Sequence, residues 1–179
     1  AMPNTILLYE PIHERGRKLL EAAGEVLIAE SLKEAALLPL FPRVDAVVAR
    51  AVGIVSRRLM EAAPRLKVVG RHGAGVDNID VGAATELGIW VVNTPAAPSE
   101  SLAEHFFLLA LALCRNFRQA DQGLRHGDWN VRHRSVGVEL QNKTVGIVGL
   151  GRTGRLIAQK CRAAFDIRIL YSDVVAAPP

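Results

Sequence analysis

The sequence has few cysteines, no histidine pattern typical of a metal site and no long hydrophobic run. Its two cysteines, Cys114 and Cys161, show neither metal-ligand nor disulfide spacing, which predicts a reducing, cytoplasmic location. The five histidines share no metal-site spacing either, so we expect no metal. The longest apolar run, Phe106–Cys114, is far too short to span a bilayer, and the N-terminus does not resemble a signal peptide. We therefore expect a cytoplasmic protein that is not embedded in a membrane.

Aromatic residues are also scarce, at 5% of the chain, although half of the residues are hydrophobic. A core built from Ala, Val, Leu and Ile suits parallel strands covered by helices. The formal net charge is +4, but the basic residues are scattered and form no run of five or more. A dispersed excess of this kind argues against nucleic-acid binding and is compatible with an anionic small molecule.

Short apolar strands alternate with helical segments through the first half of the chain. The alternation predicts a parallel sheet covered on both faces, that is, a doubly wound α/β domain over residues 1–98. Expected strands are Thr5–Tyr9, Val26–Ala29, Asp45–Ala49, Leu66–Gly70 and Ile89–Val92. Expected helices are His13–Ala23, Leu32–Leu38, Arg57–Ala63 and one that Asp80 caps and Gly88 ends.

The second half opens with a hinge-like segment, Thr94–Ser99, followed by a long helix over Ser101–Phe117. Ser101 and Glu104 have capping-box spacing. The helix is apolar on every face, so we expect it to be buried on all sides, between domains or between subunits. Residues 123–142 are polar and contain several glycines, which predicts an irregular connection.

The motif Gly149-Leu150-Gly151-Arg152-Thr153-Gly154 lies where a dinucleotide site requires it. We expect a strand over Thr144–Val148, then the motif, a helix over Arg155–Phe165, a strand over Ile167–Tyr171 and finally Asp173. Such glycines let the backbone approach a pyrophosphate, which the helix N-terminus attracts. A carboxylate at Asp173 suits the adenosine ribose and repels a 2′-phosphate, which favours NAD over NADP. A tight turn without a ligand is the alternative.

A second candidate site follows the fourth expected strand, in the segment from Arg71 to Asp80. Backbone N–H groups at Gly73, Ala74 and Gly75 would suit an anion such as a substrate carboxylate, because ligands of open α/β sheets bind beyond the carboxyl ends of strands. Arg50, at the end of the third strand, would add positive charge. A plain strand–helix connection explains the same residues equally well.

Together these motifs resemble the D-isomer-specific 2-hydroxyacid dehydrogenases, most closely their phosphoglycerate dehydrogenase-like branch. The stretches that carry the resemblance are LKVVGRHGAGVDNID (66–80), GIWVVNTP (88–95) with SLAEH (101–105), VGVELQNKTVGIVGLGRTG (136–154) and the terminal acid Asp173. Their order along the chain is more specific than any one of them.

The resemblance implies a flavodoxin-like substrate domain over residues 1–98. Residues 99–179 would form a linker helix and the first strand–helix–strand unit of a Rossmann domain. Arg50 and the Gly73–Gly75 backbone would hold the substrate carboxylate. The cofactor NAD would be held by Gly149, Gly151, Arg152, Thr153, Gly154 and Asp173. A homodimer would form through residues 101–142. The reaction implied is hydride transfer between C2 of a D-2-hydroxy acid, first of all D-3-phosphoglycerate, and nicotinamide.

The sequence also departs from the family pattern. The catalytic Arg, Glu and His of the family lie further along the chain than any position here, so we expect these 179 residues alone to be inactive. Pro98 stands where Asn is common, and Thr153 stands where a branched apolar residue is common. The alternative function is a non-catalytic NAD(H)-sensing or dimerisation module on the same fold.

Overall fold

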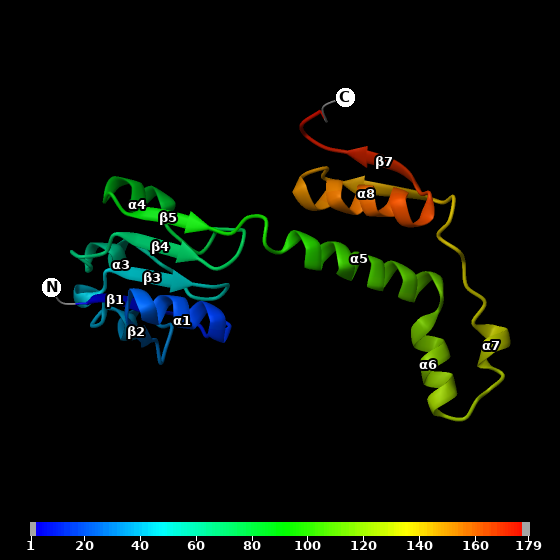
Figure 1. The fold of residues 1–179 in the computed structure, drawn as a ribbon, viewed down its shortest axis with the longest axis horizontal. Coiled ribbons are helices and arrows are strands. Elements are labelled where there is room, and N and C mark those ends of the chain that lie inside the picture. Colours follow the sequence, from blue (N-terminus) through cyan, green and yellow to red (C-terminus); the bar gives the residue numbers. More distant parts are fainter. Residues whose placement is uncertain (1–2, 177–179) are drawn as a thin grey trace. The chain divides into compact units, whose positions relative to one another are not determined.

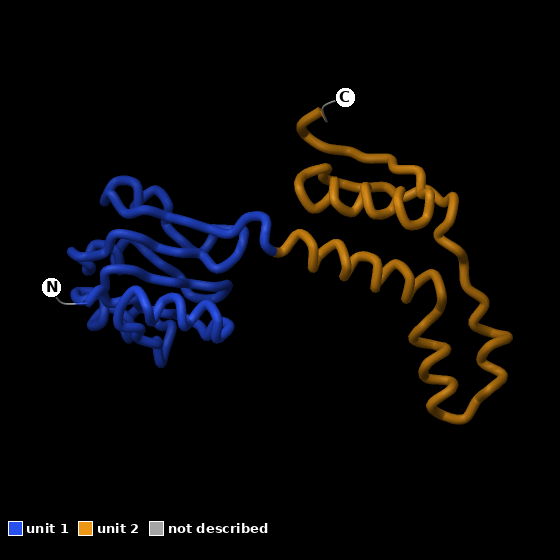
Figure 2. The backbone as a smooth tube through the Cα atoms, viewed as in Figure 1, with its two compact units in different colours: residues 1–97 blue, residues 98–179 orange. Residues whose placement is uncertain are grey.

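The computed structural model describes residues 3–176 and has the mixed α/β architecture expected from the sequence (Figure 1). The chain divides into two compact units, residues 1–97 and residues 98–179 (Figure 2). Within residues 3–176 no helix combines the length and the apolar character needed to cross a membrane.

The first unit contains a five-stranded sheet in which every neighbouring pair of strands is parallel. Its strands are β1 (Asn4–Leu8), β2 (Gly24–Ile28), β3 (Ala46–Ala49), β4 (Val68–Arg71) and β5 (Trp90–Asn93). Its helices are α1 (Glu14–Ala23), α2 (Glu34–Leu37), the 3₁₀ turn η1 (Phe41–Arg43), α3 (Arg57–Glu61) and α4 (Val81–Glu86). The spatial order β2-β1-β3-β4-β5 is the flavodoxin-like order, whose ligand crevice lies where the order reverses, between β1 and β3.

The core of this unit lies mainly on one face of the sheet. Val47 and Val69 on neighbouring strands are fully buried against helix and turn residues such as Phe41 and Leu59. Leu7 and Leu8 of β1, which lies between β2 and β3, are both buried, as expected for a strand covered on both faces. At the sheet edge, by contrast, Trp90 of β5 is 75% exposed.

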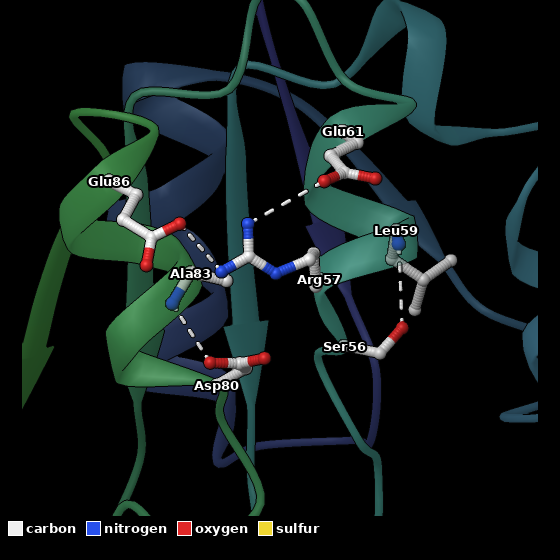
Figure 3. A network of polar contacts seen from close by, with 7 residues as sticks. All are labelled: Ser56, Arg57, Leu59, Glu61, Asp80, Ala83 and Glu86. Atoms are coloured by element: carbon white, nitrogen blue, oxygen red, sulfur yellow. Dashed lines mark hydrogen bonds and ion pairs between the residues drawn. The ribbon is translucent and has the colours of Figure 1, made fainter.

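Short polar side chains fix the ends of α3 and α4 (Figure 3). The Asp80 carboxylate accepts the N–H of Ala83 at 2.8 Å, as its predicted capping role requires, and the Ser56 hydroxyl caps α3. The Arg57 guanidinium joins the two helices through its ion pair with Glu86 at 2.7 Å. These contacts hold the start of α4, where the segment that begins at Gly73 ends.

The second unit contains α5 (Ser99–Cys114), α6 (Phe117–Arg125), α7 (Val131–Arg134), β6 (Thr144–Val148), α8 (Arg152–Phe165) and β7 (Arg168–Ser172). Strands β6 and β7 are parallel, with α8 as their crossover helix. The rings of Phe107 on α5 and Phe165 on α8 lie 6.0 Å apart, and Cys161 of α8 is fully buried.

The start of α5 differs from the sequence-based prediction. The predicted capping box at Ser101 and Glu104 is wrong: α5 begins at Ser99, and no side chain caps it. Pro98 has helical dihedral angles and its carbonyl accepts the N–H of Leu102, so the helix starts earlier than the capping pattern suggests. In the single chain Leu108 is 61% and Leu113 is 77% exposed, so the expected burial of this helix between domains or between subunits stays a prediction.

The prediction that residues 123–142 are irregular is wrong in part, because this region contains the end of α6 and all of α7. Gly123 lies inside α6 rather than ending it. A methyl group on Gly123 would come within 2.6 Å of Val131, so the glycine allows the close approach of α6 and α7. Its role is packing, which polarity and glycine content did not reveal.

Asp45 gives a testable stability contribution in the first unit. Its carboxylate is nearly buried, accepts the Thr5 N–H at 2.8 Å and pairs with Arg65 at 2.7 Å. The Thr5 N–H and the Arg65 guanidinium together lower the pKa of Asp45 despite its burial. We expect Asp45→Asn to destabilise the first unit by about 1–3 kcal/mol in urea unfolding, because Arg65 loses its charged acceptor.

The pH dependence has a defined sign. Since the pKa of Asp45 is lowered in the folded state, its contribution is present above the unfolded pKa of about 4 and is lost as the pH falls through the folded value. Glu21→Gln, in the exposed α1 pair with Arg17, is the control and should cost about 0.5 kcal/mol or less. Equal effects of the two variants at neutral pH would contradict the assignment.

Candidate functional site

Glu10 occupies the point where the strand order of the sheet reverses. It follows β1, and its carboxylate accepts the backbone N–H groups of Arg50 at 2.7 Å, Val52 at 2.9 Å and Gly53 at 3.3 Å, all in the loop after β3. Partial burial raises the pKa of Glu10, but these donors and the Arg50 charge outweigh it, so the pKa is lowered. The switch point therefore already contains a carboxylate that belongs to the protein.

Asn78 joins the loop after β3 to the loop after β4. Its side-chain amide donates to the carbonyls of Gly53 at 2.5 Å and Arg50 at 3.2 Å. Val55 and Ile79 add a parallel bridge between the same two segments. The structure thus brings together two stretches that the sequence analysis could only place at the same edge of the sheet.

The carbonyl groups of the Gly73–Gly75 segment accept hydrogen bonds from residues at the end of β5. Thr94 donates its N–H to the carbonyl of Gly73 at 2.9 Å, and the Asn93 side chain donates to the carbonyl of Ala74 at 2.7 Å. Among residues 3–176, no acceptor contacts the N–H of Ala74 or Gly75. Two adjacent unpaired donors suit an anion such as a carboxylate.

Arg50 lies beside this loop system, but its side chain points to another group. Its guanidinium donates to the carbonyl of Pro11 at 2.8 Å, and its charge lowers the pKa of Glu10. The sequence-based assignment of Arg50 to the substrate carboxylate stays a prediction.

A cavity of about 270 Å³ lies beside the same loop, between α1 and the carboxyl ends of β3, β4 and β5. Arg71, His72, Asn93 and Thr94 supply its polar lining. In the part of the chain that the structure describes, no group of three or more His, Cys, Asp or Glu side chains could hold a metal ion.

The Gly149–Gly154 motif forms the turn between β6 and α8. Gly149 has a φ of 91°, in the left-handed region that favours glycine. A methyl group on Gly154 would collide with the carbonyl of Gly149, so no other residue permits this approach of helix and loop. Gly151 is the N-cap residue, and no side chain caps α8.

Asp173 lies at the same turn, at the end of β7. One carboxylate oxygen accepts the N–H of Leu150 and the other accepts the N–H of Val175 at 3.1 Å. These N–H donors lower the pKa of Asp173, and the nearby Arg155 contributes to the same shift. The structure thus places the predicted acid against the glycine-rich turn, 19 residues beyond it in the chain.

The turn meets the physical requirements of a pyrophosphate site. The first N–H groups of α8, including those of Thr153 and Gly154, have no acceptor within the helix and lie at its positive end. A methyl group on Gly149 or Gly151 would meet no other described atom within 4 Å, so the space beside the backbone is open. Asp173 adds the carboxylate that a ribose diol requires.

Sequence reasoning missed Glu10 and Asn93 and gave Asn78 no role of its own, and in the structure these three side chains join the loops by hydrogen bonds. Glu10 and Asn93 each stand at the carboxyl end of an apolar strand, which was the available signal. Their partners are 19 to 43 residues away in sequence, so no local pattern identified the contacts.

Comparison with known families gives a match that spans both sites. The model for "D-isomer specific 2-hydroxyacid dehydrogenase, catalytic domain" matches residues 6–172. The chain belongs to this family. Its members are oxidoreductases that act on small hydroxy acids with a nicotinamide cofactor.

Two relatives in the family illustrate the range of similarity. The D-3-phosphoglycerate dehydrogenase of Methanocaldococcus jannaschii is 46% identical over 168 residues, which are 94% of this chain and 32% of the relative. The glyoxylate reductase of Pyrococcus furiosus is 37% identical over 179 residues, covering 95% of this chain and 53% of the relative. The chain thus spans about a third to a half of the length of these family members.

A solved structure in the family's fold supports the architecture. The NAD-dependent formate dehydrogenase of Staphylococcus aureus, crystallised in complex with NAD, superposes with a TM-score of 0.75 at 28% identity. The match covers 96% of this chain and 56% of that protein. The predicted α/β fold class and the predicted family are both confirmed.

Alanine substitutions in the glycine motif distinguish a glycine needed for packing from one that borders open space. We expect Gly154→Ala to destabilise the second unit by about 1–3 kcal/mol, because its methyl group collides with backbone at Gly149. Gly151→Ala is the matched control, with open space around it, and should cost about 1 kcal/mol or less. Thermal unfolding and hydrogen exchange of α8 measure both; a Gly154→Ala protein as stable as the Gly151→Ala protein would refute the packing role.

Proposed function

We propose that this protein is an NAD-dependent D-2-hydroxyacid dehydrogenase, with D-3-phosphoglycerate as the first substrate to test. The observation that carries the proposal is the turn at Gly149–Gly154, where an uncapped helix N-terminus, open backbone and Asp173 converge. The D-3-phosphoglycerate dehydrogenase relatives support the choice of substrate, and the glyoxylate reductase is the reason to test glyoxylate beside it.

The two units would divide the work. Gly149, Gly151, Arg152, Thr153 and Gly154 would receive the pyrophosphate at the N-terminus of α8, and Asp173 would bind the adenosine ribose. Bound NAD supplies the carbon that accepts a hydride from C2 of the hydroxy acid. In the first unit, the Ala74 and Gly75 N–H groups would hold the substrate carboxylate, with Arg50 as nearby positive charge.

The first unit is the proposed substrate domain, residues 1–98, and residues 99–179 are the proposed linker helix and start of the cofactor domain. We assign no residue of this chain as the general acid–base that removes the hydroxyl proton, since no described side chain in either site has the family's catalytic role by resemblance. We therefore propose that these 179 residues bind ligands but do not transfer hydride by themselves.

The decisive experiment measures nucleotide binding and turnover together. We expect the chain to bind NADH more tightly than NADPH by calorimetry, and we expect no change in NADH absorbance with D-3-phosphoglycerate and NAD. Asp173→Ala should bring the two affinities to within about threefold, because a carboxylate beside a 2′-phosphate costs about 1 kcal/mol or more.

Asp166→Ala is the matched control, an aspartate at the far end of α8 that should leave the NADH preference unchanged. Failure of the chain to bind either nucleotide would overturn the cofactor site, and equal affinities in the unsubstituted chain would overturn NAD specificity. Turnover by these residues alone would refute the proposed absence of an acid–base group.

We also propose that the chain forms homodimers through residues 101–142. The support is a group of exposed apolar side chains on α5 and at the start of α6. This group exposes more apolar surface than the surface helices of soluble proteins usually do. Its members are Leu102, Leu108, Leu109, Leu113 and Phe117.

Oligomeric state by light scattering tests this proposal. We expect a mass near twice 19.4 kDa for the unsubstituted chain and a shift to monomer in Leu108→Glu, since a buried unpaired charge at an apolar interface is costly. Leu19→Glu on α1, at a leucine outside the region that is 73% exposed against 61% for Leu108, should remain dimeric. A monomeric unsubstituted chain, or dissociation by both variants alike, would contradict the interface.

A further inference from the structure

Arg155 lies in the first turn of α8, one residue after the glycine motif, and its side chain folds back toward the turn. Its Nε donates to the carbonyl of Leu150 at 2.9 Å. Among residues 3–176, no hydrogen bond involves its terminal nitrogens, Nη1 and Nη2, and no ion pair includes this arginine. The guanidinium therefore keeps its charge and most of its N–H donors available for a ligand.

Leu150 connects Arg155 to Asp173. The N–H of Leu150 donates to the Asp173 carboxylate, and the carbonyl of the same residue accepts the Nε of Arg155. The N–H groups of Val175 and Leu150 are the main cause of the lowered pKa of Asp173, and the charge of Arg155 adds to it. A carboxylate and a guanidinium thus lie at one place in the turn without forming an ion pair with each other.

These two groups favour different forms of an adenosine ribose. A carboxylate accepts a hydrogen bond from a free 2′-hydroxyl and repels a 2′-phosphate, whereas an arginine close by accommodates the phosphate. Hydrogen bonds from a guanidinium to a phosphate are among the strong ones, because both partners are charged. With Asp173 and Arg155 side by side, the turn has a partner for each form.

The structure also leaves room for an anion beside the guanidinium. A hollow of about 550 Å³ lies over the first turns of α8. It is lined by Gly151, Arg152, Arg155, Leu156 and Gln159. No carboxylate is among these lining residues, so an anion in the hollow would meet the charge of two arginines and the positive end of the helix.

We propose that Arg155 admits a 2′-phosphate to this turn, so that the chain binds NADP(H) as well as NAD(H). In this assignment Asp173 sets the preference for NAD(H), and Arg155 keeps that preference small by supplying the phosphate with a cation. The proposal rests on the proposed function and makes its cofactor class more specific, because Asp173 alone would exclude the phosphorylated ribose.

The test is a ¹⁵N–¹H NMR titration of the 179-residue chain with 5′-AMP and, separately, with adenosine 2′,5′-bisphosphate. These probes differ only in the 2′-phosphate. Both should shift the amide signals of Leu150 and Gly154, with 5′-AMP binding more tightly by about tenfold or less. Arg155→Met should weaken the bisphosphate by about tenfold and change 5′-AMP little, because the lost contact is to the 2′-phosphate. Arg155→Lys should weaken the bisphosphate by about threefold, since an ammonium group keeps the charge but not the paired donors.

Arg162→Met is the matched control, an arginine of the same helix about two turns further on, and it should bind both probes like the unsubstituted chain. Equal weakening of both probes in Arg155→Met would overturn the proposal, because it would assign Arg155 to the 5′-phosphate that they share. Unchanged binding of the bisphosphate in that variant would overturn it as well. So would an unsubstituted chain that binds 5′-AMP but not the bisphosphate.

Failure of the proposed function has a different signature. If neither probe shifts the amides of the turn in the unsubstituted chain, the cofactor site itself fails and this proposal fails with it. If 5′-AMP binds and only the effect of Arg155→Met is missing, the cofactor site stands and Arg155 has no part in it. Hydrogen exchange of α8 checks that each variant is folded, and should Arg155→Met not fold, unchanged bisphosphate binding in Arg155→Lys counts against the proposal.

Discussion

The parallel pairing of β1, β3, β4 and β5 is the constraint on which both the fold and the loops of the candidate site in the first unit depend. Because parallel strands end at the same edge of a sheet, the segments that follow β1, β3, β4 and β5 all emerge together. Glu10, Asn78 and Asn93 then cross-link these segments by hydrogen bonds. The unpaired N–H groups of Ala74 and Gly75 follow from that arrangement, since the neighbouring carbonyls are the groups that β5 engages.

In the second unit, too, parallel strands bring the segments that follow them to one edge, and here a helix rather than a cross-linked loop begins at that edge. The parallel pair β6 and β7 places Ser172 and Asp173 beside the turn that precedes α8, and Gly149 donates its N–H to the Ser172 carbonyl at 2.8 Å. The missing side chain at Gly154 lets the helix start close to this turn. A dipole end, open backbone and a carboxylate are thereby collected within one strand–helix–strand segment, which is why this site could be recognised from spacing alone.

Two neighbouring clusters at the sheet edge of the first unit differ in how completely their charges and donors are paired. At the switch point, the Glu10 carboxylate satisfies three backbone donors and offsets the Arg50 charge. At the neighbouring loop, Arg71 has no such partner among the described residues, and neither do two backbone donors. Buried polar groups in folded proteins are usually paired, and the two clusters at this sheet edge differ in how completely their donors are paired among the described residues.

Local sequence was sufficient for most of the elements and for the glycine-rich turn. Apolar strands that alternate with helices, such as the helix that Asp80 caps and Gly88 follows, predicted the α/β class, and the family match confirms the resemblance that the motifs carried. The helix over residues 99–114 shows the limit of that reasoning, since its apolar composition predicts burial but not the surface that buries it, and several of its leucines are exposed in the single chain.

The sequence by itself determined the strand–helix alternation, the glycine-rich turn and its acid, because each depends on residues close in the chain or at a fixed spacing. Only the tertiary structure decided which groups Arg50 and Arg71 lie against. That choice depends on Pro11, Glu10 and Gly73, whose contacts with Arg50 and Arg71 arise from the packing of strand ends far apart in sequence. By charge the two arginines are equivalent, but their guanidinium groups donate to different backbone carbonyls, those of Pro11 and His72.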